Sequence, residues 1–198
     1  MTRDYPRTQE REARIREVLR QRQDDLTLVL ANIHDPHNVS AIYRSCDAFG
    51  VSKVRLFYDG VPFPQLNEKS SGSARKWVES ERHDSLDSLM SDLKSEGMTV
   101  LATSFSPDAR PLREWDFLKP TAIILGNEHA GVSPEIIGRA DGELYIPMRG
   151  MIQSFNVSVA AAIILAEAAR QREEAGFYSR PWQATDDIER RREEWLKK

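Results

Sequence analysis

The chain has 198 residues, of which 40% are hydrophobic and 30% are charged, the balance of a folded globular protein rather than a disordered one. Its formal net charge is −3, so the molecule as a whole does not resemble a bulk nucleic-acid binder, and any RNA site has to be a local basic patch. A single cysteine, Cys46, excludes an intramolecular disulfide and a multi-cysteine zinc site.

Targeting and membrane signals are missing from the sequence as given. Residues 1–19 lack the apolar core of a signal peptide. The longest apolar run, 157–166, is about half of the roughly 20 residues that span a bilayer. We therefore expect a cytoplasmic protein without a membrane span.

The first predicted element is an amphipathic helix over about residues 8–23, with Ile15, Val18 and Leu19 on one face. Residues 1–23 hold seven arginines and four acidic residues, a local balance of +3. Such a basic helix is consistent with an RNA contact. The simpler alternative is a charged face that points to solvent.

A parallel α/β sheet is predicted from residue 26 onward, because short β-branched or leucine-rich runs alternate with helical patterns. The expected strands are 26–31, 53–58, 98–103, 121–126 and 143–147. The expected helices are 39–49, 85–96, 134–140 and 157–174. We expect one domain over residues 1–198, with a mostly parallel sheet flanked by helices, and with the helix at 8–23 and the tail at 177–198 as appendages.

End signals support three of these helices. Asp84 and Gly97 bracket the second, and Ser133 followed by a proline opens the third. Gly176 ends the last. The segment 59–77 is rich in Pro, Gly and Ser and predicts a long loop, which in a compact domain is often functional.

Ligands of parallel α/β sheets bind at the carboxyl ends of the strands, so the loops there carry the functional signal. Neither a G-x-G-x-x-G after the first strand nor a G-x-x-x-x-G-K-[ST] is present, which leaves a conventional dinucleotide or P-loop site unsupported. Three other loops are rich in Gly, Asn, Glu and His. In the third, Gln153, Ser154 and Asn156 lead directly into an apolar helix, where buried polar groups need partners.

Three motifs lie in these loops. The first is "NVSAIYRSCDAFG", in which Asn38 precedes Arg44 by six positions. The second is "LGNEHAGVSPE", with Gly126 and Glu128 before a helix. The third is "IPMRGMIQSFNVSVA" at 146–160. In this order they closely resemble the motifs of the SpoU family of RNA 2′-O-ribose methyltransferases, part of the SPOUT superfamily.

The resemblance extends upstream to "REARIREVLRQRQDDLTLVLANIHDPHN" and there resembles the branch of the family that acts on guanosine 18 of tRNA. It implies a SPOUT-type α/β knot, in which the chain after the last strand forms a deep C-terminal trefoil knot. It also implies S-adenosylmethionine as cofactor and a homodimer. Apolar residues at helical spacing fit either a dimer contact or a monomer core: Val157, Ala160, Ala161 and Ile164.

By the same resemblance, Arg44 has the central role in methyl transfer. The family's arginine is often described as deprotonating the 2′-hydroxyl, but a guanidinium is effectively always protonated, so a bidentate grip on the substrate phosphate is physically cheaper. The other motif positions would orient Arg44, the ribose or the cofactor: Asn38, Glu128, Ser154 and Asn156. Six residues would line the cofactor site: Thr103, Gly126, Ile146, Met148, Gly150 and Phe155. Gly150 would allow close approach of the chain.

The expected substrate is tRNA methylated at guanosine 18 in the D-loop, with Arg11, Arg14 and Arg22 as hypothetical phosphate contacts. The nearest rival keeps the chemistry and changes the substrate to ribosomal RNA or another tRNA nucleotide. A rival from another class is a non-catalytic knotted RNA-binding protein. The intact motif residues argue against it.

Each residue also has a purely structural explanation. Asn38 is a good helix cap, Arg44 is spaced to pair with Asp47, and Ser154 and Asn156 are start signals for the last helix. Only the joint occurrence of the three motifs favours the functional interpretation.

Cys46 and the histidines carry no further chemistry in this interpretation. Methyl transfer to oxygen needs no thiol, so Cys46 is predicted to be a small buried helix residue. Of the four histidines only His34 and His37 have metal-ligand spacing, and no third ligand of the usual type is near them in sequence. We expect no metal.

Overall fold

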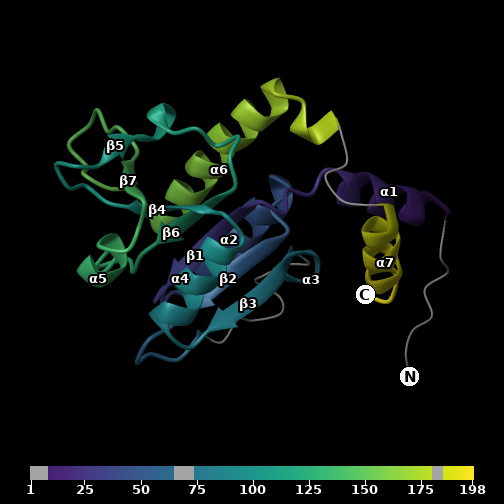
Figure 1. The fold of residues 1–198 in the computed structure, drawn as a ribbon, viewed down its shortest axis with the longest axis horizontal. Coiled ribbons are helices and arrows are strands. Elements are labelled where there is room, and N and C mark those ends of the chain that lie inside the picture. Colours follow the sequence, from purple (N-terminus) through teal and green to yellow (C-terminus); the bar gives the residue numbers. More distant parts are fainter. Residues whose placement is uncertain (1–8, 65–73, 180–184) are drawn as a thin grey trace.

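The computed structural model describes residues 9–64, 74–179 and 185–198, and its centre is a parallel sheet (Figure 1). The strands of this part of the chain pair in the order β3-β2-β1-β6-β4-β7-β5, all parallel. Their bounds are β1 Leu26–Ala31, β2 Lys53–Phe57, β3 Glu79–His83, β4 Thr99–Thr103, β5 Arg110–Pro111, β6 Thr121–Leu125 and β7 Gly142–Tyr145. The predicted parallel sheet is confirmed.

Two strands were not predicted, for a physical reason in each case. β3 reads Glu-Ser-Glu-Arg-His at the edge of the sheet, where only its last residue is buried, so it lacks an apolar pattern. β5 has two residues and lies at the opposite edge. Both are edge strands, which need little hydrophobicity because one side of each is not covered by a neighbouring strand.

The helices confirm the predicted alternation. They are α1 Gln9–Arg20, α2 Pro36–Ala48, α3 Ala74–Trp77, α4 Leu86–Ser95, α5 Pro134–Ile137, α6 Val157–Glu174 and α7 Thr185–Leu196, with 3₁₀ turns η1 Leu112–Glu114 and η2 Phe177–Ser179. Ser133 caps α5 as expected. The cap of α4 is Ser85 and not Asp84, because the Ser85 hydroxyl accepts from the Ser88 backbone N–H. α3 lies in the segment predicted as a loop, of which residues 65–73 lie outside the described part.

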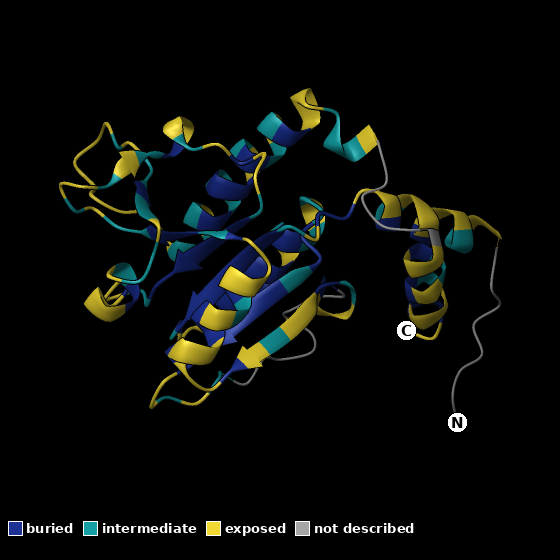
Figure 2. Cartoon of the chain, viewed as in Figure 1, coloured by how far each residue is buried: buried dark blue, intermediate teal, exposed yellow. Residues whose placement is uncertain are grey.

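Helices cover both faces of the sheet. On one face, α2 and α6 pack against alternate residues of the central strands, among them Leu28, Leu30 and Ile123. On the other face, α4 and α5 pack against the intervening residues, including Val29 and Ile124. Figure 2 shows the result: the strands of the sheet are mostly buried, and the outer side of α4 is exposed. None of the described helices is long and apolar enough to cross a membrane.

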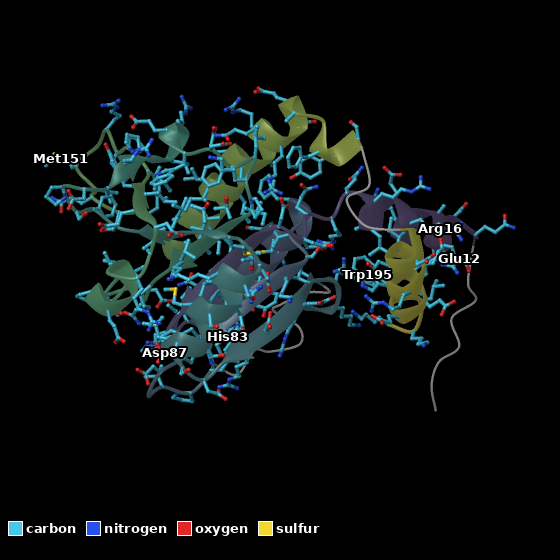
Figure 3. The ribbon with its side chains drawn as sticks, in the orientation of Figure 1. Glu12, Arg16, His83, Asp87, Met151 and Trp195 are labelled. Carbon is cyan, nitrogen blue, oxygen red and sulfur yellow. The ribbon has the colours of Figure 1, made fainter. Side chains whose placement is uncertain are left out.

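The helices α1 and α7 form a separate pair beside the sheet (Figure 1). Ile15 and Leu19 of α1 pack on Ile188, Trp195 and Leu196 of α7. Trp195 also contacts the ring of Trp77, with the ring centroids 4.9 Å apart. The α1–α7 pair thus lies at one side of the molecule, whereas Met151 lies at the far side (Figure 3).

Candidate active site

The three sequence motifs meet at the carboxyl ends of β1 and β6, where the chain connections switch from one face of the sheet to the other. β2 and β3 extend from one side of β1, and β6 and β4 from the other. The chain after β1 continues into α2 on one face, whereas the chain after β6 continues into α5 on the opposite face. Such a switch point opens a crevice at the carboxyl ends of two neighbouring parallel strands, the usual ligand site in this architecture.

Glu128 ties the two sides of this crevice together. Its carboxylate accepts hydrogen bonds from the backbone N–H groups of His34 and Asp35, both at 3.2 Å, and from the Asn38 side-chain amide at 2.9 Å. Burial alone would raise the pKa of Glu128, but these hydrogen bonds outweigh it and hold the pKa below its ordinary value. Glu128 is therefore a fixed carboxylate between the loop after β6 and the start of α2.

Asn38 and Asn156 continue this network into the third motif. The Asn156 amide donates to the Asn38 side-chain oxygen at 2.9 Å, and the Asn156 oxygen caps α6 by accepting from the Ser158 backbone N–H at 2.8 Å. The cap of α2 is Asp35, so a helix cap does not explain Asn38. Asn156, in contrast, both caps α6 and belongs to the network.

The sequence suggested that the polar residues before α6 are buried and therefore need hydrogen-bond partners, but the structure does not bury them. Gln153, Ser154 and Asn156 are exposed, so water satisfies whatever the protein does not. The expectation of burial was wrong because the apolar face of α6 begins only after Asn156. Ser154 is nevertheless in place, since it lines the cavity described below.

Arg44 lies on α2 with its side chain exposed. Asp47, its possible ion-pair partner, is bound to Arg22 instead. Within the described ranges no hydrogen bond or ion pair engages the Arg44 guanidinium. Arg44 thus presents an uncommitted cation on the helix whose first turn is fixed by Glu128.

A cavity of about 480 Å³ opens beside this network at the ends of β4, β6 and β7. We call it the cofactor cavity. Four of the six predicted cofactor residues line it, namely Thr103, Gly126, Ile146 and Phe155, together with Glu128, Ser154 and Asn156 from the catalytic set. Met148 and Gly150 lie outside its lining.

Gly126 is the glycine that this cavity requires. A Cβ at this position would lie 2.1 Å from the Gly131 carbonyl carbon and 2.2 Å from the Val132 nitrogen, both backbone atoms. At Gly150 an added Cβ would meet nothing within 4 Å. The close approach predicted for Gly150 is therefore wrong, because its loop is open, and the tight passage of the backbone is at Gly126.

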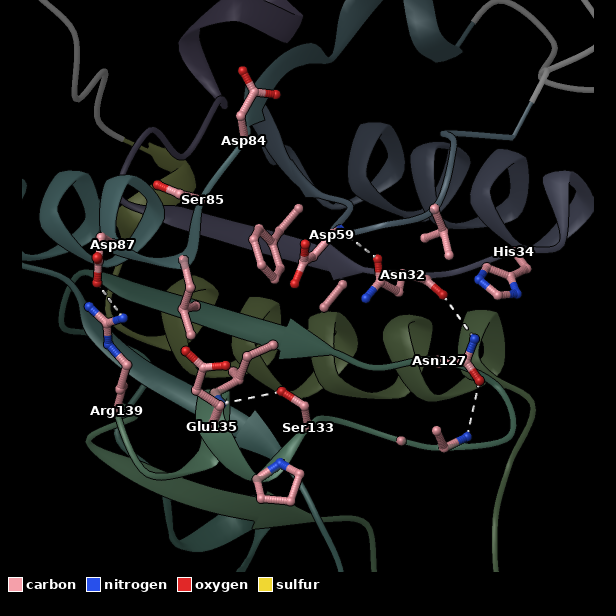
Figure 4. Close-up of a pocket in the computed structure, with 18 residues that line it drawn as sticks. Asn32, His34, Asp59, Asp84, Ser85, Asp87, Asn127, Ser133, Glu135 and Arg139 are labelled. Atoms are coloured by element: carbon pink, nitrogen blue, oxygen red, sulfur yellow. Dashed lines mark hydrogen bonds and ion pairs between the residues drawn. The ribbon is translucent and has the colours of Figure 1, made fainter.

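A second cavity, of about 740 Å³, lies on the other side of the loop after β6 (Figure 4). Asn127, Ala130 and Gly131 line both cavities. Its remaining walls come from the chain after β1, β2 and β3 and from α5. Because it carries several acidic side chains, we call it the acidic cavity.

Sequence reasoning missed the two residues that shape the loops between these cavities. Asn32, directly after β1, has a φ of 54°, and its backbone oxygen accepts from the Asn127 side-chain amide at 2.9 Å. The Asn127 oxygen accepts from the backbone N–H groups of His129 and Ala130. Their position immediately after buried strands, together with the tolerance of asparagine for positive φ, is the signal that would have found them.

The predicted RNA-contacting arginines divide into two groups. Arg14 is exposed on α1, and Arg11 is half-buried there. Arg22 is 1% exposed, donates to the Val51 carbonyl and stacks on Trp195. Its assignment as a phosphate contact is wrong, because its guanidinium is used inside the protein to join α1, α2 and α7.

Cys46 is fully buried, and burial raises the pKa of its thiol, as expected for a structural residue. Among the described residues one group has the composition of a metal site, formed by Glu81, His83 and Asp92. Glu81 there contacts both Lys53 and Arg55. Two cations already neutralise this carboxylate, so the group is an ion-pair cluster and carries no argument for a metal.

Comparison with known proteins identifies the family of this chain. The model of the SpoU rRNA Methylase family matches residues 25–166. A tRNA (guanosine(18)-2′-O)-methyltransferase of Thermus thermophilus is 50% identical over 192 residues, which cover 97% of this chain and 98% of the relative.

Solved structures extend the likeness to three dimensions. The Aquifex aeolicus TrmH/SpoU tRNA modifying enzyme matches with a TM-score of 0.88 and 43% identity, over 94% of this chain and 95% of that one. The SpoU methyltransferase AviRb from Streptomyces viridochromogenes, crystallised with its cofactor AdoMet, matches with a TM-score of 0.68 and 26% identity, over 77% of this chain and 62% of that one.

Proposed function

Because this chain belongs to the SpoU methylase family, we propose that it transfers a methyl group from S-adenosylmethionine to the ribose 2′-hydroxyl of guanosine 18 in the D-loop of tRNA. The observation that carries the proposal is the meeting of all three motifs at one crevice, through the Glu128–Asn38–Asn156 network. The high identity to a tRNA (guanosine(18)-2′-O)-methyltransferase over nearly the whole chain favours tRNA over ribosomal RNA.

The cofactor cavity fits S-adenosylmethionine. Its volume of about 480 Å³ is in the range of small-molecule sites, and its lining combines apolar side chains with a few polar groups. Gly126 keeps the wall clear where a side chain would collide with backbone. When bound, the cofactor supplies an activated methyl group on its sulfonium. Thr103, Ile146, Ser154 and Phe155 are the residues placed to hold it.

We assign Arg44 to the substrate phosphate. Its guanidinium is exposed and uncommitted to the described residues, and a guanidinium binds phosphate through two parallel hydrogen bonds that also fix orientation. An arginine base would have to release a proton that it holds tightly. Asn38 and Glu128 then act as positioning residues, because they fix the start of the helix that carries Arg44.

The proposal includes the deep trefoil knot and the homodimer of the family. For the knot, the support is the match to the SpoU family model over residues 25–166 and the likeness to the Aquifex aeolicus TrmH/SpoU enzyme, with a TM-score of 0.88. For the dimer, the support is a patch of exposed apolar residues around the third motif: Met151 (98% exposed), Ile152 (72%), Phe105 (65%), Val159 (44%) and Phe155 (42%). Ala161 and Ile164 are fully buried in the monomer core. The proposed dimer contact therefore uses the exposed patch instead of these two residues.

The α1–α7 pair is our candidate for gripping the tRNA. Arg14, Arg16 and Arg20 are exposed on α1, and α7 carries Arg190 on its own exposed side. Because the proposed substrate is tRNA, we also propose that the protein works in the cytoplasm. In this arrangement residues 1–198 form one methyltransferase domain with the helix pair as its appendage.

The decisive experiment maps the methyl group. Unmodified tRNA is incubated with labelled S-adenosylmethionine, digested and analysed for 2′-O-methyl nucleotides, with Arg44→Ala beside the wild type. We expect label at guanosine 18 that falls at least about 1,000-fold in Arg44→Ala, since the phosphate grip orients the reacting hydroxyl. Calorimetry should show unchanged cofactor affinity, because Arg44 does not line the cofactor cavity.

The control is Arg113→Ala, which removes an exposed arginine of η1 and should methylate like the wild type. Label at another nucleotide would replace the substrate site. Cofactor binding without any label on tRNA would overturn tRNA as substrate and favour ribosomal RNA. Full activity of Arg44→Ala would remove Arg44 from the mechanism.

A further inference from the structure

The acidic cavity has the build of a ligand site. Its floor is apolar and belongs to the core, with Phe57, Leu86 and Ile136 all less than 9% exposed. Polar side chains rise from the chain segments around this floor (Figure 4). An apolar floor with a few converging polar groups is the general form of a small-molecule or nucleobase pocket.

The side-chain oxygens of the two asparagines in this cavity are already used within the protein. Asn32 accepts from the Asp59 backbone N–H at 3.0 Å through its side chain, and from Asn127 at 2.9 Å through its backbone. Asn32 holds a positive φ of 54° to do so, a strained conformation that is concentrated at functional sites. The Asn127 oxygen is used by its own loop. These hydrogen bonds fix the positions of both asparagines in the cavity wall.

Three of the four carboxylates in the lining, by contrast, are free to bind a ligand. Asp87 pairs with Arg139 at 2.6 Å, which neutralises the single arginine of the lining. Asp59, Asp84 and Glu135 have no ion pair with any residue in the described ranges, and their side chains are exposed. Asp59 and Glu135 lie on opposite walls (Figure 4). The cavity thus offers hydrogen-bond acceptors and a negative potential.

This chemistry selects among the parts of an RNA nucleotide. A phosphate is repelled by unpaired carboxylates. An ionised carboxylate only accepts hydrogen bonds, so it binds a group with adjacent N–H donors. Guanine presents such a pair on its Watson–Crick edge, N1–H and the N2 amino group. Adenine presents one donor beside an acceptor, which a carboxylate does not match.

The position of the cavity relates this selectivity to the reaction. The acidic and cofactor cavities are separated by one loop, since Asn127, Ala130 and Gly131 line both. His34, next to the Glu128 network, also lines the acidic cavity. A nucleotide whose ribose lies at the Glu128–Asn38 network can therefore extend its base into this space.

We propose that the acidic cavity receives the base of the target guanosine, and that the Asp59 carboxylate, whose backbone is held by Asn32, accepts hydrogen bonds from both its N1–H and its N2 amino group. This rests on the proposed function, which assigns the methyl group to a tRNA guanosine. Under this proposal Asp59 sets specificity for the base, and the cofactor cavity has no share in it.

The test compares tRNA transcripts that carry guanosine, inosine or adenosine at position 18. Inosine lacks only the N2 amino group. For the wild type we expect kcat/KM to fall about 10- to 100-fold from guanosine to inosine, the effect of losing a charge-assisted hydrogen bond. In Asp59→Asn the guanosine-to-inosine ratio should fall toward 1 and adenosine should gain, because a carboxamide both donates and accepts. Glu135→Gln, which removes the charge on the opposite wall, should keep the wild-type ratio.

Two measurements separate this proposal from a loss of fold or of function. Cofactor affinity by calorimetry should be unchanged in both variants, and Glu114→Gln, which alters an exposed carboxylate outside both cavities, should keep the wild-type ratio. A wild type that methylates guanosine 18 without discriminating against inosine would overturn the base pocket alone. So would an Asp59→Asn variant that keeps the full ratio. A wild type that leaves tRNA unmethylated would overturn the proposed function itself.

Discussion

The cofactor cavity and the acidic cavity share a wall but differ in almost everything else. The cofactor cavity is lined by glycine and by apolar groups such as Leu125 and Ile146, with Glu128 committed to the protein. In the acidic cavity, three of the four carboxylates have no ion pair within the described part of the chain, and they lie above a floor made by the core. One short loop, 127–131, divides a site for an organic cofactor from a site for hydrogen-bond donors.

The difference shows how a parallel sheet builds two sites from one switch point. The loop after β6 turns toward one face of the sheet and the chain after β1 turns toward the other. Asn127 fixes the loop from inside, and Glu128, one residue later, fixes the start of α2. Neighbouring residues therefore face different sites, so a substitution is expected to disturb one cavity, the other or their common wall.

The largest effect should come from the common wall. In Gly126→Ala the new Cβ would lie 2.1 Å from the Gly131 backbone, which has to move. A clash with backbone costs on the order of 3 kcal/mol, so cofactor affinity should fall about 100-fold, as measured by calorimetry. Gly150→Ala is the matched control, because its Cβ meets nothing within 4 Å, and it should bind like the wild type. Equal losses in the two variants would show that the Gly126 passage does not shape the site.

A smaller effect is expected from Glu128→Gln, which keeps the shape of the side chain and removes its charge. The backbone N–H groups of His34 and Asp35 and the Asn38 amide would lose an ionised acceptor. We expect kcat to fall about 10- to 100-fold because α2, with Arg44, is held less firmly, and a hydrogen bond to a charged group contributes about 1.5–3 kcal/mol. The guanosine-to-inosine ratio should not change, since the acidic cavity keeps its carboxylates.

The same variant carries a pH signature. Hydrogen bonds hold the pKa of Glu128 below its ordinary value, so the folded state binds this proton less readily than the unfolded state. The stability that this carboxylate contributes is complete above its ordinary pKa and is lost as pH falls through the lowered one. Urea denaturation should therefore show a gap between wild type and Glu128→Gln at neutral pH that closes in acid. A gap that persists in acid would contradict the charge-based explanation.

Much of this site was accessible from the sequence, because its parts are local. Alternating apolar runs predict the sheet, and the three motifs predict that Asn38, Glu128 and Asn156 meet. The pairing of their side chains was not predictable, since it depends on the register of β1 against β6. The family resemblance also placed the tight glycine at Gly150 rather than Gly126, because the backbone that passes Gly126 comes from a turn whose geometry no local pattern reports.

The acidic cavity and the helix pair lay beyond sequence reasoning for different reasons. Asp59 and Glu135 are 76 positions apart in sequence, and only the tertiary fold brings the chain after β2 and the helix α5 to the same cavity. Arg22 looked like its neighbours on a basic helix, yet it is buried because α7 returns to cover it with Trp195. Long-range packing determines both the acidic cavity and the burial of Arg22. The sequence around a single arginine in a charged run does not indicate such packing.

The smallest effect should come from a residue that touches neither cavity. Arg14 is exposed on α1 and lines neither cavity. Arg14→Ala should therefore weaken tRNA binding only a few-fold. If Arg14 contacts a phosphate, the slope of log affinity against log salt should become shallower by about 1, because one fewer counterion is released on binding. Binding titrations at several salt concentrations measure this, with Arg113→Ala as the matched exposed arginine. The kcat and the guanosine-to-inosine ratio should stay at wild-type values, because the electrostatic grip acts before the nucleotide enters either cavity. An unchanged salt slope would remove Arg14, and with it this face of α1, from the RNA-binding surface.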